Sequence, residues 1–136
     1  MTNPSTPKAA TPKRKPARSR SEEVADPPLP SLRFYYSEGL HKRTLSLLDT
    51  LEGASNPTKH GDDLAELVEE LMVSGMNYYF MKPLKDANAG FIIQQSANLG
   101  MAGAQKVLGS VIKSIIGRMD APELLSICGS IRHFMV

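Results

Sequence analysis

The sequence predicts an all-α protein: a compact bundle of about four mostly antiparallel helices, preceded by a disordered basic N-terminal tail. Two observations lead to this fold class. From residue 31 onward, apolar side chains recur every three or four residues, which is the repeat of an amphipathic helix. No segment in that part alternates apolar and polar residues for long enough to predict a strand.

Residues 1–30 differ in composition from the rest of the chain and define the predicted domain boundary. They hold seven of the ten prolines and contain few sizeable apolar side chains. Such a segment cannot bury enough surface to offset the entropy of ordering it. We therefore expect a disordered tail over residues 1–30 and one helical domain over residues 31–136.

The positive charge of the chain is concentrated in this tail. Residues 31–136 contain ten Lys/Arg and eleven Asp/Glu, so the domain is nearly neutral. A dense run of cations binds polyanions such as nucleic acid non-specifically, and the tail has no aromatic side chain to stack on bases. A nuclear-localisation patch or a purely solubilising segment has the same composition, so these alternatives stay open. The candidate polyanion-binding residues are Lys8, Lys13, Arg14, Lys15, Arg18 and Arg20.

The first helix is predicted from residue 31 or 32 to Leu51. Tyr36, Leu40 and Leu48 fall on one stripe of such a helix. The breaker-rich residues 52–57 should end it.

The second helix is predicted to begin near residues 61–63, where two acidic side chains suit the positive end of a helix dipole. From Leu64 to Phe80 the apolar spacing of three and four is the clearest in the chain. Pro83 should end or kink this helix just after Lys82.

The third helix is predicted from residue 88 or 89 to residue 118 or 119. One stripe of it has the spacing of a coiled-coil seam. Its first half is made of small residues, which allow another helix to approach closely and offset the cost of glycines within a helix. The predicted helix-contact seam comprises Ala97, Gly100, Met101, Ala104, Leu108, Val111 and Ile115.

Polar residues at the start of the third helix suggest a second candidate site. Gln94 lies on the line of the seam, where a buried amide needs a hydrogen-bond partner. It could set the register of the helix packing, or it could line a small polar pocket. The candidate pocket residues are Asn77, Tyr78, Gln94 and Asn98.

The fourth helix has the strongest start signal. Asp120 and Glu123 have the spacing of a capping box, and Pro122 lies in the first turn, where its missing N–H is tolerated. Cys128 lies on the apolar stripe and should behave as a small buried hydrophobe.

The sequence does not indicate catalytic residues, a cofactor or a metal. Glu38 and His41 form a single Glu-x-x-His, whereas di-iron bundles use two such motifs and two further carboxylates. The glycine-rich segment 100–103 lacks the pattern of a phosphate loop. Residues 87–105 are uncharged, but three amide side chains within them argue against a membrane span.

The leading functional prediction is a non-enzymatic helical interaction or oligomerisation protein. It would self-associate, or bind a protein partner, through the third helix, and its tail would attract polyanions. A single cysteine favours a reducing compartment, and we expect a cytoplasmic protein. Two other classes stay open: a protein that adsorbs to a membrane or granule surface, and a small-ligand-binding bundle or enzyme.

Overall fold

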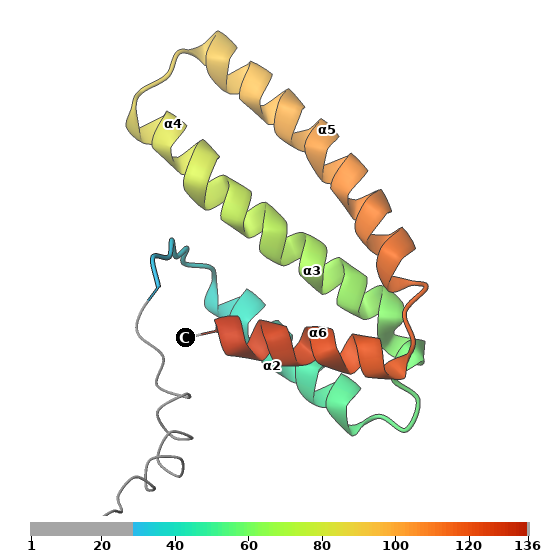
Figure 1. The fold of residues 1–136 in the computed structure, drawn as a ribbon. Coiled ribbons are helices and arrows are strands. Elements are labelled where there is room, and N and C mark those ends of the chain that lie inside the picture. The colour runs from blue at the N-terminus through green and yellow to red at the C-terminus, as the bar shows by residue number, and fades with distance from the viewer. Residues whose placement is uncertain (1–28, 136) are drawn as a thin grey trace, which may run out of the picture. The chain divides into compact units, whose positions relative to one another are not determined.

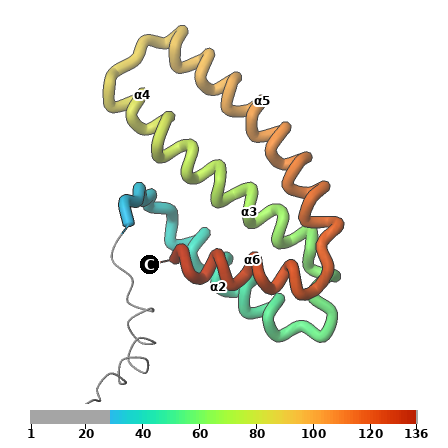
Figure 2. The backbone as a smooth tube through the Cα atoms, viewed as in Figure 1, coloured from blue at the N-terminus to red at the C-terminus, as the bar shows by residue number. Residues whose placement is uncertain are grey.

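A computed structural model describes residues 29–135 (Figures 1 and 2). The chain divides after Arg33 into two units, and residues 29–33 of the first unit are exposed and have no regular secondary structure. The second unit, from Phe34, forms a bundle of helices and contains no strand within the described residues. The all-α prediction is confirmed, whereas the predicted disorder of the tail falls almost entirely on residues 1–28, outside the described residues.

Helix α2 spans Glu38–Gly53. The Ser37 side chain caps it by accepting a hydrogen bond from the Leu40 backbone amide at 3.1 Å. The predicted start at residue 31 or 32 is therefore wrong, because a serine N-cap begins a helix at the following residue. Tyr36 lies before the helix and still packs against the core.

A single-turn 3₁₀ helix, η2 (Pro57–His60), leads into α3 (Gly61–Met76). The predicted start near residues 61–63 is confirmed, and Asp62 and Asp63 occupy the first turn. Helix α3 continues without interruption into a π-helical turn, η3 (Asn77–Met81), and then into α4 (Lys82–Asp86).

Pro83 does not end this continuous helical segment, so the first alternative of the prediction, a helix that stops just after Lys82, is wrong. The winding changes just before it instead: the Lys82 N–H donates to the carbonyl of Asn77, five residues back. A proline lacks an N–H and crowds the carbonyl four residues earlier. The wider π turn relieves that crowding, and the helical path then continues to Asp86.

A tight turn reverses the chain between α4 and α5 (Phe91–Ile116). Asn88 adopts a φ of 56°, and its N–H donates to the Lys85 carbonyl at 3.0 Å. The Ala89 N–H donates to the Leu84 carbonyl at 3.2 Å. These two bonds make a Schellman motif with asparagine in the left-handed position, and α5 runs back beside α3 as one arm of a long hairpin (Figure 2).

Helix α6 (Ala121–Phe134) begins with the predicted capping box. The Glu123 amide donates to the Asp120 side chain at 2.9 Å, and the Asp120 amide donates to the Glu123 side chain at 3.0 Å. Asp120 is in an extended conformation, as a cap requires. The predicted signal and the observed start of the helix therefore agree.

The core lies at one end of the bundle, where α2, η2, α6 and the start of α3 meet the last turn of α5. Thr44 is buried there, and its hydroxyl donates to the Leu40 carbonyl at 2.7 Å. Burying one leucine side chain contributes about 1.5–3 kcal/mol. The buried apolar residues are Leu40, Leu48, Leu51, Leu64, Ala65, Leu67, Ile116, Leu124 and Cys128.

An ion-pair cluster joins α2 to α6 beside this core. The Arg132 guanidinium contacts the carboxylates of Asp49 and Glu52, at 2.8 Å for the closest Glu52 oxygen. Hydrogen bonds to Glu52 and then to Asp49 raise the pKa of Arg132 above its ordinary value. Because these ion pairs are exposed at the surface, they contribute little to the free energy of unfolding. Their main effect is on the alignment of α2 with α6.

Candidate functional site

Helix α5 is the most exposed apolar element of the described chain. Its 26 residues include only two charged side chains, Lys106 and Lys113, yet Ile116 is its one buried residue. Ile92 is 77% exposed, and Leu99 and Val107 are 74% and 65% exposed. Large apolar side chains that gather on an exposed surface mark interaction sites, so this exposure makes α5 the candidate functional surface.

Within the chain, one side of α5 is turned toward α3. Ala97, Met101 and Leu108 on this side are half-buried, and Ile112 packs against the core. These positions follow a spacing close to 3.6 residues, which keeps them on one line of a straight helix.

The predicted seam starts on this side and then leaves it. Ala97, Met101 and Leu108 are half-buried, whereas Gly100 and Ala104 are exposed. Val111 and Ile115 are 48% and 52% exposed, and their neighbours Ile112 and Ile116 pack inward instead. A repeat of 3.5 residues drifts by about 20° per heptad around a straight helix, which carries the later seam positions away from α3.

The glycines of α5 fall into two groups. A Cβ built at Gly100 or Gly103 would meet no other atom within 4 Å, whereas one built at Gly109 would lie 2.5 Å from a carboxylate oxygen of Glu69. Of these three glycines, only Gly109 lies where α5 closely approaches α3. The sequence predicted that small residues such as Gly100 allow another helix to approach closely, but no helix of the described chain lies against Gly100.

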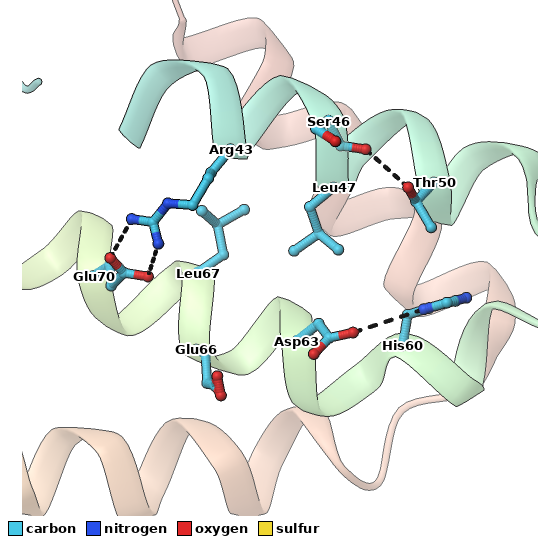
Figure 3. Close-up of a pocket in the computed structure, with 9 residues that line it drawn as sticks. All are labelled: Arg43, Ser46, Leu47, Thr50, His60, Asp63, Glu66, Leu67 and Glu70. Carbon is cyan, nitrogen blue, oxygen red and sulfur yellow. Dashed lines mark hydrogen bonds and ion pairs between the residues drawn. The ribbon is translucent and has the colours of Figure 1, made fainter. Parts of the chain in front are cut away.

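Helix α3 has an acidic side and, opposite Glu70, a side with an exposed apolar residue. Glu66 and Glu70 lie on the side of α3 that faces the groove against α2 (Figure 3). Met72 follows Glu70 by two residues, which is about 200° around a helix, so it lies on the opposite side. It is 43% exposed there.

Helix α5 has a side that turns away from α3. Gly109 and Val107 lie about 100° from the inward-facing Leu108, in opposite directions. Gly109 lies against Glu69 of α3, whereas Val107 is 65% exposed. We define the apolar face of the hairpin as the stripe of α5 that contains Ile93, Gly100, Ala104, Val107 and Val111.

Sequence reasoning missed this face as a unit. Ile93 and Val107 were outside the predicted seam, although they share a stripe with Gly100, Ala104 and Val111 at intervals of seven, four, three and four residues. The signal was a second stripe with the same spacing on the same helix. Choosing between two adjacent stripes requires knowing which one α3 covers.

The four residues of the predicted polar pocket have different surroundings. The Gln94 side chain donates to the Ala89 carbonyl at 2.9 Å and so ties the start of α5 to the hairpin turn. Asn77 and Asn98 are exposed, and Tyr78 packs edge-on against Tyr79. Gln94 thus has the hydrogen-bond partner that its half-buried position requires.

An aromatic cluster surrounds the π-helical turn. The Phe34 ring lies over the buried Gly75, 3.6 Å from the position of a Cβ there, and meets Tyr79 edge-on. Tyr35 meets Tyr78 in the same way, with ring centroids 5.9 Å apart. The cluster holds the segment before α2 against α3, and no element of it was predicted.

A shallow polar groove of about 420 Å³ separates α2 from α3 on the other side of the hairpin (Figure 3). Arg43 forms a bidentate ion pair with Glu70, and His60 lies 3.7 Å from Asp63. The Glu70 carboxylate is thus neutralised by Arg43 of α2. None of the four predicted pocket residues lines this groove.

The residues of the Glu-x-x-His and Cys128 have contacts of their own within the described part of the chain. No three His, Cys, Asp or Glu side chains of this part approach closely enough to hold a metal ion. His41 of the Glu-x-x-His instead contacts the Tyr36 hydroxyl, with Nδ1 3.0 Å from the oxygen. Cys128 is buried as predicted, and this burial raises the pKa of its thiol.

The candidate polyanion-binding residues lie outside the described part of the chain, since all six fall within residues 1–28. Among the helices that are described, none is both long enough and apolar enough to cross a bilayer. No protein-family model, no curated protein and no solved structure matches the chain.

Proposed function

We propose that this protein is a non-enzymatic helical interaction protein that self-associates through the apolar face of its hairpin. One observation carries the proposal: large apolar side chains of α5, among them Ile92, Leu99 and Val107, are exposed, and only Ile116 of its 26 residues is buried. Exposed apolar patches on soluble proteins mark interaction surfaces. The groove on the opposite side is polar and its Arg43–Glu70 pair is already formed, so the apolar face is the stronger candidate.

The hydrophobic effect supplies the driving force for this association. Each Å² of apolar surface removed from water contributes roughly 25 cal/mol. Val107 and Ile93 are more than half exposed in the single chain, so covering them gains most of their transfer free energy. A protein partner covers them without requiring the helix to refold.

The experiment is sedimentation of the full chain at tens of micromolar, as wild type and as Val107→Glu. We expect a dimer or higher oligomer that Val107→Glu returns to the monomer, because the carboxylate would have to be buried unpaired. Ala102→Glu is the matched control, since it adds the same charge at an exposed α5 position about 140° away. A monomeric wild type at these concentrations contradicts the proposal.

Binding of polyanions through the tail is the second part of the proposed function. Its support is the excess of six Lys/Arg and no acid within residues 1–20. A titration of nucleic-acid binding against salt, with and without residues 1–30, tests it. We expect affinity that falls with salt and is lost with the tail, and equal affinity of both chains would remove this part.

Adsorption to a lipid or granule surface is the alternative that uses the same face. The observation in its favour is that the cations of α5, Lys106 and Lys113, flank an apolar surface. Flotation with vesicles of anionic lipid separates the two proposals. A protein that stays out of the lipid fraction and sediments as an oligomer supports self-association. We place it in the cytoplasm under either proposal, on the single buried thiol of Cys128.

A further inference from the structure

We draw no further inference here: the strongest candidate, the apolar face of the hairpin along α5, supports no more than the proposed self-association, because nothing in the structure shows what covers it.

Discussion

The two ends of this protein use the same kind of side chain in opposite ways. At the core end, Leu48, Leu51 and Leu124 are almost completely inaccessible to solvent and hold α2, α3 and α6 together. Along the hairpin, Leu99 and Val107 are equally apolar and lie in solvent. The core end contains its own packing partners, whereas the hairpin contains only two helices and can bury only one side of each. The excess apolar surface of α5 is therefore directed outward.

The largest expected effect comes from truncating a core leucine. Leu48→Ala should lower the free energy of unfolding by about 2–5 kcal/mol, because it removes buried contacts and leaves a cavity. Leu99→Ala, the same change in the exposed part of α5, should change it by less than about 0.5 kcal/mol. Urea denaturation of both variants at one protein concentration measures the difference. Equal losses would mean that the two ends of the molecule are not distinct.

Loss of the α6 cap should come next in size. Asp120→Ala removes the acceptor for the Glu123 amide, and N-cap replacements of this kind cost about 1 kcal/mol. Ser37→Ala at the start of α2 should cost a similar amount, because its hydroxyl bonds the Leu40 amide. Ser110→Ala, at an exposed position within α5, is the control. Thermal melts of the three variants should rank the control as the most stable.

Replacing glycines of α5 should affect the stability of the single chain and its self-association differently. Gly100→Ala and Gly103→Ala should each stabilise the single chain by up to about 1 kcal/mol, because alanine favours a helix and both positions are open. Only Gly100→Ala should weaken the self-association, since its added methyl group lies on the apolar face and that of Gly103→Ala does not. Unfolding under dilute conditions and sedimentation at higher concentration measure the two effects. Equal loss of the oligomer in both variants would count against the apolar face as the surface of association.

The smallest effect concerns the thiol of Cys128. Burial raises its pKa above the ordinary value of 9.0, so the folded protein keeps the thiol protonated at pH values where the unfolded chain ionises. The fold therefore has its full stability below about pH 9 and loses some of it as the pH rises further. Cys128→Ser lacks this titration and should flatten the fall in stability above pH 9. Alkylation of the wild type with iodoacetamide at pH 8 should be slow until urea is added.

Local signals in the chain predicted the elements whose cause is local. The capping box at Asp120 and Glu123 is a contact between residues three apart, and the acidic start of α3 reflects the dipole of its own first turn. The buried position of Cys128 followed from the apolar stripe of α6. Each of these features depends on residues within one or two turns of a helix.

One error occurred where a distant segment decides the outcome, and two concern local features that the prediction did not use. The start of α2 moved to Glu38 because Ser37 caps it while Phe34 packs on Gly75, some forty residues away. The rod passed Pro83 because a π turn absorbs the crowding before it. Asn88 in the left-handed conformation at the hairpin turn had a local signal, an asparagine after a helix, that was not used.

Amphipathic spacing was enough to establish that this chain forms helices, roughly where they run, and that their stripes pack into one all-α domain. Such spacing reports only which residues share a side of a helix. The tertiary structure decided which side of α5 meets α3, and hence that Ile112 turns inward while Val107 and Val111 stay in solvent. The physical reason is that packing geometry, through 3.6 residues per turn and the position of α3, selects one of two adjacent apolar stripes that look alike along the chain.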